Sequence, residues 1–466
     1  MQKLISKYGL AAHLALMSVA PLFLFPFCDV WQTGITLLWL TLVGGLWLFF
    51  EPSRRNSEML HQARIRVSGA VFSDPLFWIF VVLAVVAAAR WANGGVALAY
   101  NAGDGQWFIS RPSLPWLPGH ANGEGFIQFV VVLSLAVVVE GCRHALGKSA
   151  RMAFLFMGSF LAGVAAIIAA LAARVGVQGA SEAMGLSIFR LPSFAGCAFG
   201  LYMLGGIVAL AGLFECKWNK ALLLFVFAVG ASASGLFYFA PLPVALAFAV
   251  AALVLIVASV VHLLLFFSPP DVVKFIVAFF IAALIPVLLA VCVVPKEVTD
   301  ARLAFFFSDG LLFPEGFAEA RVRLSEIARN VWRDHLWLGS GIGAFPLDVR
   351  FAATDEDWLV WTAGVPKGAL HGWWQLIAER GIFGALAIAV PLCFMVYTFV
   401  RRLVAAIGRH VFLPLCGLGF VAVAVVVAET FIDASLLRPE TLMALGAFLA
   451  LSASAFPPPR RREEEK

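Results

Sequence analysis

Long apolar runs recur from one end of this chain to the other, and they constrain its fold more than any other feature. A helix needs roughly 20 apolar residues to cross about 30 Å of hydrocarbon, and many of the runs reach that length. Hydrophobic residues make up 62% of the 466 residues and charged residues only 13%, a balance that excludes an ordinary soluble protein. We therefore predict an all-α integral membrane protein with about twelve transmembrane helices.

The first apolar run lacks the small residues of a signal-peptide cleavage site, so we predict that it is retained as the first span. The predicted spans lie near 10–28, 30–50, 75–93, 125–140, 152–173, 193–214, 221–239, 244–267, 275–294, 374–400, 411–430 and 441–456. A large polar loop follows the ninth span, and such long connections are usually functional. The predicted regions are a bundle of about nine spans over 1–294, this loop over 295–370, C-terminal spans over 371–456 and a disordered tail over 457–466.

Basic residues in short loops mark the cytoplasmic side of a membrane protein. They fall in four connections that the predicted spans place on one side, at 54–66, 143–151, 217–220 and 401–409. This pattern predicts that both termini are cytoplasmic. The large loop 295–370 and a smaller segment, 94–123, then lie on the opposite face.

The large loop contains one stretch with helical periodicity, EGFAEARVRLSEIARNVWRDH (315–335). Its apolar face is formed by Phe317, Leu324, Ile327, Val331 and His335, which recur at helical spacing. We predict an amphipathic helix that lies on the membrane surface, with Glu326 paired to Arg329. Arg321 flanks the apolar face and is the arginine best placed to point inward, whereas Arg323 flanks the other side.

Two stretches follow this helix: the first is rich in glycine, and the second contains two tryptophans. LGSGIGAFP (338–346) has three alternating glycines, which suit a tight re-entrant turn or a close approach of the backbone to a ligand. It does not fit a phosphate-binding glycine loop, because no strand precedes it and no GK[ST] follows it. GALHGWWQLIAERGIFG (368–384) places His371, Trp373 and Trp374 where a helix starts. Tryptophans at such a place typically anchor a helix at the headgroup level.

Three stretches, in this order, resemble the O-antigen ligase and O-antigen polymerase family of bacterial envelope glycosyltransferases. RLPSFAGC (190–197) looks like the family's PN-x-x-AG entrance to a span. RDHLWLGSGIGAF (333–345), together with Arg321, is similar to the glycine signature of its periplasmic loop. HGWWQLIAERGIFG (371–384) looks like its HN-x-x-LQ-x-x-E-x-G-x-x-G return into the membrane. The resemblance covers roughly residues 190–400.

The resemblance implies a transferase of the bacterial inner membrane, acting at the periplasmic face on an undecaprenyl-diphosphate-linked glycan. The glycan would pass to a hydroxyl acceptor, which is the lipid A core for a ligase and another lipid-linked repeat unit for a polymerase. The shared motifs do not separate these two activities. The expected partners are this donor, a lipid or saccharide acceptor and membrane lipids, with no nucleic acid, no metal ion and no other cofactor.

A diphosphate is already a good leaving group, so the reaction needs mainly a base for the acceptor hydroxyl and cations for the departing charge. The resemblance implies His371 as this base and Arg321 as a bidentate ligand of the diphosphate. The further residues expected to bind substrate or to orient the histidine are Arg323, Arg190, Arg302, Glu379, Trp373 and Trp374. The acidic run TDEDW (354–358) is predicted to be a solvated loop rather than a metal site.

The sequence departs from the family pattern at two places. The histidine is followed by Gly372 where the family usually has Asn, and its separation from Glu379 is one residue shorter. The arginine of the family's S-x-SRG segment is missing from ASASGLF (231–237). Either Arg190, Arg174 or Arg302 replaces it, or the chain is a divergent relative with reduced or no transferase activity. Two other functions remain open: a transporter or flippase, which needs a polar path through the bilayer, and an inactive scaffold for envelope assembly.

Overall fold

The computed structural model describes most of the chain, namely residues 2–24, 28, 30–50, 67–101, 103–110, 114, 117–121, 124–175, 195–240, 242–294, 296, 299–300, 317–352, 369, 371–405, 412–431 and 437–454. Within these ranges, nine helices are long and apolar enough to cross a membrane, and three shorter apolar helices accompany them. The predicted helical, multi-pass membrane class is therefore confirmed in outline. The number of spans stays a prediction.

The apolar helices overlap all twelve predicted stretches. They are α1 (Gln2–Leu24), α2 (Val30–Phe50), α4 (Pro75–Asn93), α5 (Glu124–Glu140), α6 (Lys148–Val175), α8 (Ala195–Glu215), α9 (Leu222–Phe239), α10 (Leu242–Phe266), α11 (Pro269–Cys292), α16 (Gly372–Ala405), α17 (Leu413–Glu429) and α18 (Pro439–Ser454). Prolines at the first or second position start α4, α11 and α17, where the missing N–H costs no helical hydrogen bond.

Helix α8 forms the centre of the bundle. Residues 196–214 of this helix are all buried, and the helix contacts α6, α9, α10, α17 and α18. Gly200 allows one of these contacts, because a Cβ atom there would lie 2.6 Å from the ring of Phe248. Helix α11, in contrast, packs mainly against α9 and leaves most of its apolar side chains exposed, as expected of a lipid-facing helix.

A two-stranded hairpin in the smaller segment is an addition to the helical architecture that the sequence analysis did not predict. Strands β1 (Ala97–Asn101) and β2 (Gln106–Ser110) pair antiparallel, with Tyr100 opposite Trp107. The turn is held by hydrogen bonds from Gly105 N to Asn101 O, 2.9 Å, and from Gly103 N to Asn101 Oδ1, 3.0 Å. The turn residues NAGDG between ALAY and QWFIS are a hairpin signal that was present in the sequence, but apolar helical periodicity does not detect it.

The predicted amphipathic helix is α13 (Phe317–Asp334), and it packs on protein rather than on the membrane surface. Leu324, Ile327 and Val331 are buried in a cluster with residues of α14 (Phe345–Ala352) and α16. The predicted partner of Glu326 is also wrong, because Glu326 forms an ion pair with Arg323 at 3.1 Å. Residues 301–316 and 353–368 of the predicted loop, and the tail from 455 onward, lie outside the described residues.

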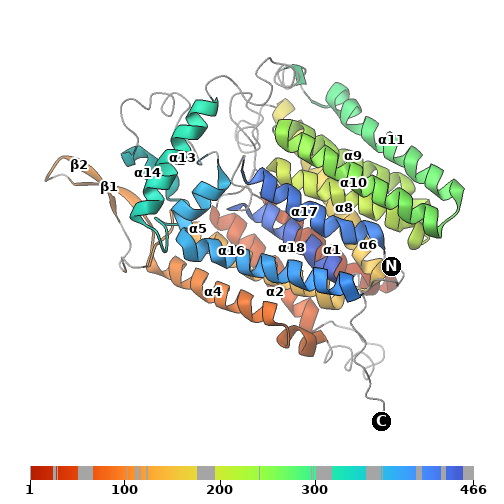
Figure 1. Cartoon of the computed structure of the whole chain (residues 1–466), viewed down its shortest axis with the longest axis horizontal. Helices are drawn as coiled ribbons and strands as arrows, with labels where there is room; N and C mark the ends of the chain where they lie inside the picture. The colour runs from red at the N-terminus through yellow and green to blue at the C-terminus, as the bar shows by residue number, and fades with distance from the viewer. Residues whose placement is uncertain are drawn as a thin grey trace, which may run out of the picture.

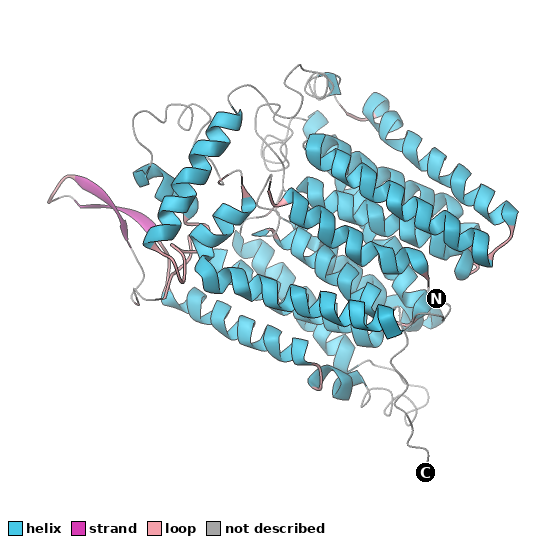
Figure 2. Cartoon of the chain, viewed as in Figure 1, coloured by secondary structure: helices cyan, strands magenta, loops and turns pink. Residues whose placement is uncertain are grey.

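The elements of the two polar segments gather at one end of the bundle. Figure 1 shows α13, α14 and the hairpin there, with the N-terminal end of α1 at the opposite end. The loops that join the hairpin, α13 and α16 meet in the same region (Figure 2). The glycine stretch 338–346 and the start of α16 therefore lie at the end of the bundle that carries α13, whereas residues 190–194 of the motif RLPSFAGC lie outside the described residues.

Candidate functional site

Helix α16 is interrupted at Gly381, and this break organises the site. Gly381 has φ 63° and ψ −170°, a conformation that is essentially restricted to glycine. A Cβ atom at this position would lie 2.4 Å from the carbonyl carbon of Trp337. The break divides α16 into a short arm, Gly372–Arg380, and a long membrane-embedded arm that begins at Ile382.

The glycine stretch inserts its backbone into this break. Ser340 N and Gly341 N donate to the carbonyls of Ala378 and Glu379, at 2.9 and 3.1 Å. In return, Ile382 N and Phe383 N donate to the carbonyls of Leu336 and Trp337, both at 3.1 Å. Backbone groups that an interrupted helix would leave unpaired are therefore satisfied by the glycine stretch.

The glycines are needed because the two backbones touch. Gly339, Gly341 and Gly343 all have positive φ. A Cβ atom on Gly339 would lie 2.3 Å from the carbonyl carbon of Glu379. The sequence predicted either a tight turn or a close approach of this backbone to a ligand. The structure shows a tight turn, and its backbone approaches α16 closely.

The smaller segment joins the same assembly. Ile342 N donates to Gly119 O at 3.2 Å, Ala121 N to Ile342 O at 2.8 Å, and Val96 N to His120 O at 2.8 Å. We call the residues 94–96, 119–121, 336–343 and 378–383 the glycine junction. It connects the base of the hairpin, the end of α13 and the break in α16, which lie far apart in the sequence.

Glu379 stabilises the junction from inside. Its side chain is only 3% exposed, and it accepts hydrogen bonds from Gln375 Nε2 at 3.1 Å and Gly343 N at 3.2 Å. Gln375 in turn accepts a hydrogen bond from Ala369 N at 3.1 Å. These contacts connect Glu379 to the junction, whereas the sequence analysis expected it to orient His371.

A cavity of about 390 Å³ begins at the junction and runs between α4, α5, α16 and α18. Its charged lining comes from Arg90, Glu124, Arg380, Arg438 and Glu440. The remaining lining is mostly apolar, with Phe80, Ile127, Val131, Leu392, Met395 and Leu445 among the residues along it. Such a space suits an amphiphile with an anionic head and an apolar tail.

Two arginines of the cavity, Arg90 and Arg380, are buried, and each has a side-chain nitrogen without a hydrogen-bond partner among the described residues. Arg90 is 6% and Arg380 8% exposed, and this nitrogen is the Nε atom of each. Arg90 Nη2 donates to Leu338 O at 3.2 Å, which aims the side chain at the junction. Glu124 interacts electrostatically with Arg380 and Arg438 and offsets part of their charge. Charged groups at such depth in a membrane protein are costly and usually functional.

His371 and Arg321, the two residues expected to be catalytic, meet at the end of α17. Arg321 Nη2 donates to the carbonyl oxygen of Phe431, and the ring of His371 packs edge-on to that of Phe431 with centroids 5.8 Å apart. Gly372 N donates to Thr430 O at 2.8 Å, which fixes the start of α16 beside the same turn. Arg321, His371 and Phe431, which are at least 50 residues apart in the sequence, therefore lie next to one another in the fold.

The surroundings of His371 suit a general base. Burial, followed by the positive charge of Arg321, holds the pKa of His371 below its ordinary value of 6.5. Its Nδ1 atom is buried and lacks a hydrogen-bond partner among the described residues. Trp374 lies beside it, with ring centroids 6.3 Å apart, and the ring of Trp373 lies against that of Phe431, with centroids 6.1 Å apart.

The other predicted site residues are distributed unevenly. Arg323 is exposed and paired with Glu326, so it does not join His371. Arg190 and Arg302 lie outside the described residues. His371 does not line the cavity. It lies just before α16 and precedes Arg380 by nine residues, or about 13 Å at the rise of an α-helix.

Sequence analysis missed the arginines of the cavity. Arg90 interrupts a long apolar run, and an ionisable residue in such a run is a signal of function that was available in the sequence. Arg380 and Arg438 stand at ends of predicted spans, where interfacial charges are common, and only the structure brings them to one cavity. No protein-family model matches this chain, and no relative is found among curated proteins.

Proposed function

We propose that this chain transfers a glycan from an undecaprenyl-diphosphate carrier to a hydroxyl acceptor, as an O-antigen ligase does. The proposal rests on one observation above all: a largely apolar cavity carries three arginines, Arg90, Arg380 and Arg438. One of them, Arg380, lies on the short arm of α16 that begins directly after His371. A polyprenyl diphosphate has the matching form, since its two phosphates are anionic and its tail is purely hydrocarbon.

In the proposed reaction, the neutral imidazole of His371 takes the proton of the acceptor hydroxyl. The acceptor oxygen then bonds to the anomeric carbon of the donor sugar, while the bond from that carbon to the phosphate oxygen breaks. The electron pair leaves with the diphosphate, whose added negative charge is stabilised by arginines. The positive charge of Arg321 beside His371 supports this assignment, because it disfavours the protonated imidazole before the reaction.

The cavity also supplies a substitute for the arginine that ASASGLF lacks. Ser232 and Ser234 of this segment are buried in α9, where Ser232 Oγ donates to Ser159 O at 2.7 Å. Arg90, Arg380 and Arg438 provide the positive charge from other helices. In this proposal they bind the donor diphosphate, so Arg190 and Arg302 are not required for that role.

The finer membrane arrangement is part of the proposal. Twelve spans with both termini in the cytoplasm would put the glycine junction, His371 and the cavity arginines at the periplasmic face of the inner membrane. The three shorter apolar helices, Tyr8–Leu24, Leu413–Glu429 and Pro439–Ser454, then count as spans. Ligase and polymerase remain alternatives for the acceptor, because the cavity accounts for the donor alone.

Binding of the donor lipid tests the proposal most economically. The protein in nanodiscs is titrated with undecaprenyl diphosphate and undecaprenyl monophosphate, and bound lipid is counted by native mass spectrometry. A charged hydrogen bond contributes about 1.5–3 kcal/mol, so Arg380→Gln and Arg438→Gln should each weaken diphosphate binding by about tenfold or more. Arg350→Gln, which changes an exposed arginine of α14, serves as the control. Equal binding by wild type and both variants, or no preference for the diphosphate, would remove the basis of the proposal.

A further inference from the structure

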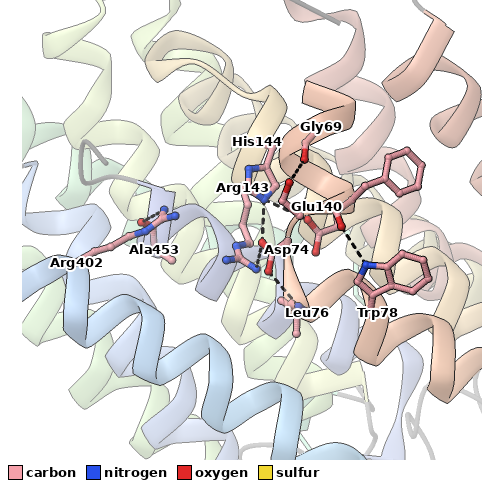
Figure 3. A network of polar contacts seen from close by, with 11 residues as sticks. Gly69, Asp74, Leu76, Trp78, Glu140, Arg143, His144, Arg402 and Ala453 are labelled. Atoms are coloured by element: carbon pink, nitrogen blue, oxygen red, sulfur yellow. Dashed lines mark hydrogen bonds and ion pairs between the residues drawn. The ribbon is translucent and has the colours of Figure 1, made fainter. Parts of the chain in front are cut away.

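A second polar cluster lies at the end of the bundle opposite the glycine junction. It joins the start of α4 to the end of α5, and Figure 3 shows Asp74, Glu140, Arg143 and His144 pointing toward one another. The residues after Glu140 form one π-helical turn, Gly141–Ala145, a local widening that is common at functional sites. None of these residues takes part in the proposed transfer, because α4 separates Asp74 from Arg90 by about 24 Å of helix.

Three side chains of this cluster offer metal-ligating atoms at close range. His144 Nε2 lies 3.0 Å from Asp74 Oδ2 and 3.3 Å from Glu140 Oε2. One ligand atom from each residue lies within 4.8 Å of the other two. Two ligands bound tetrahedrally to Zn²⁺ at about 2.1 Å are about 3.4 Å apart, so small shifts would suffice to close a site around an ion.

The buried carboxylate of Glu140 is the independent observation that points to a ligand. Glu140 is 1% exposed, and neither carboxylate oxygen has a hydrogen-bond partner among the described residues. An ion pair with His144 involves Oε2 alone and leaves Oε1 without a cation. A buried charge in this state is costly, and an ion or ordered water usually satisfies it.

Asp74 is held in place by contacts of the kind that orient a metal-ligating carboxylate. Asp74 Oδ1 accepts a hydrogen bond from Leu76 N at 3.0 Å and so caps α4, while Arg143 Nη1 lies 2.8 Å from Oδ2. Ligating carboxylates are typically oriented by such outer hydrogen bonds. The two carboxylates supply negative charge for a divalent ion, part of which Arg143 already neutralises through its ion pair with Asp74.

We propose that Asp74, Glu140 and His144 bind one divalent transition-metal ion, for which Zn²⁺ is the best match, and thereby tie α4 to α5. An imidazole with two carboxylates suits Zn²⁺, which takes three protein ligands and a water. Mg²⁺ and Ca²⁺ fit less well because they require six or more oxygen ligands. The side chain of His144 is 17% exposed, which leaves the ion a route from solvent.

The test is a metal titration of the full-length protein in nanodiscs, with the purification tag removed and adventitious metal stripped by a chelator. Calorimetry with Zn²⁺ and the visible absorption of bound Co²⁺ report binding without any transfer assay. One Zn²⁺ per chain is expected for the wild type. Glu140→Gln keeps the shape of the side chain and Asp74→Asn keeps the helix cap, and each should weaken binding by about tenfold or more.

Glu215→Gln is the matched control, because Glu215 also contacts a buried histidine, His262, at 2.8 Å, but within the described part of the chain it belongs to no group of three potential metal ligands. It should bind metal like the wild type. Absence of stoichiometric binding in the wild type would overturn the proposal and indicate that water satisfies Glu140. Unchanged binding in both Glu140→Gln and Asp74→Asn would overturn it as well, because the metal would then be bound elsewhere.

Discussion

At the scale of single residues, Arg321 and Arg323 form a natural comparison. They stand two positions apart on α13, but Arg321 reaches Phe431 beside His371 whereas Arg323 is exposed and paired with Glu326. A guanidinium binds a phosphate with two parallel hydrogen bonds, which a lysine cannot reproduce. We predict that Arg321→Lys retains the charge and loses most transfer activity, by about tenfold or more.

Arg323→Lys serves as the control for this substitution and should leave the rate nearly unchanged. The measurement is the initial rate of glycan transfer at matched protein levels. Unchanged transfer by Arg321→Lys would show that bidentate binding by Arg321 has no part in the reaction.

The pH dependence follows from the surroundings of His371. In the folded protein, the pKa of the His371 imidazole lies below its ordinary value of 6.5, first because of burial and then because of the charge of Arg321. The neutral imidazole therefore dominates at pH 7. Transfer should fall as the pH drops through this lowered pKa, which places the acid limb of kcat/KM below pH 6.5. Arg321→Gln removes one cause of the lowering, so the limb of its residual activity should move toward higher pH.

Arg321→Lys keeps the positive charge and should keep the acid limb in place even though its rate is lower. Full pH profiles of the wild type and the two variants distinguish charge from hydrogen-bond geometry. An acid limb at the same pH in Arg321→Gln would mean that the titrating group is not the imidazole beside Arg321.

At the scale of elements, the glycine junction depends on a backbone that only glycine adopts easily. A side chain at Gly381 would need a conformation that costs roughly 1–3 kcal/mol, in addition to the collision with Trp337. We predict that Gly381→Ala lowers the thermal unfolding temperature and loses transfer activity. The comparison is Gly147→Ala, since a Cβ atom at Gly147 meets nothing within 4 Å. Equal melting curves for the two variants would contradict the account of the junction.

The elements also show where sequence analysis reached its limit. Apolar length predicted the positions of the helices, because a span of about 20 residues is a property of one segment. The hairpin was missed although Asn101 and Gly105 mark its turn, and the packing partner of α13 was wrong because an apolar helix face does not reveal whether lipid or protein covers it. The break at Gly381 depends on residues 336–341, which are distant in sequence, and so had no local signal.

At the scale of the whole molecule, the two ends of the bundle should face opposite sides of the membrane. Arg333 is exposed on α13, and Lys220 is exposed on the short connection between α8 and α9. In a cysteine-free background, we predict that Arg333→Cys reacts with a membrane-impermeant maleimide in spheroplasts, whereas Lys220→Cys reacts only after permeabilisation. The basic connections would then be cytoplasmic. Reaction of both cysteines from the same side would refute the proposed arrangement.

The sequence predicted one part of the candidate site, His371 with Arg321, but not the other part, the cavity. His371 and Arg321 were expected from the motifs, and the structure brings them to the same turn at Phe431. The cavity was not expected, since Arg90 comes from α4, Arg380 from α16 and Arg438 from the connection just before α18. The packing of the bundle brings these arginines together, and the spacing of residues within any one segment does not predict it.

The most direct test of the central claim compares the wild type with His371→Ala in liposomes that contain a lipid-linked glycan donor and a hydroxyl acceptor. A general base typically contributes 10²–10⁴ to the rate, so the variant should lose transfer by about 100-fold or more at matched protein levels. Transfer by both proteins at the same rate would contradict the assignment of His371. Transfer by neither, with a suitable acceptor present, would contradict the transferase itself and favour a transporter or a scaffold.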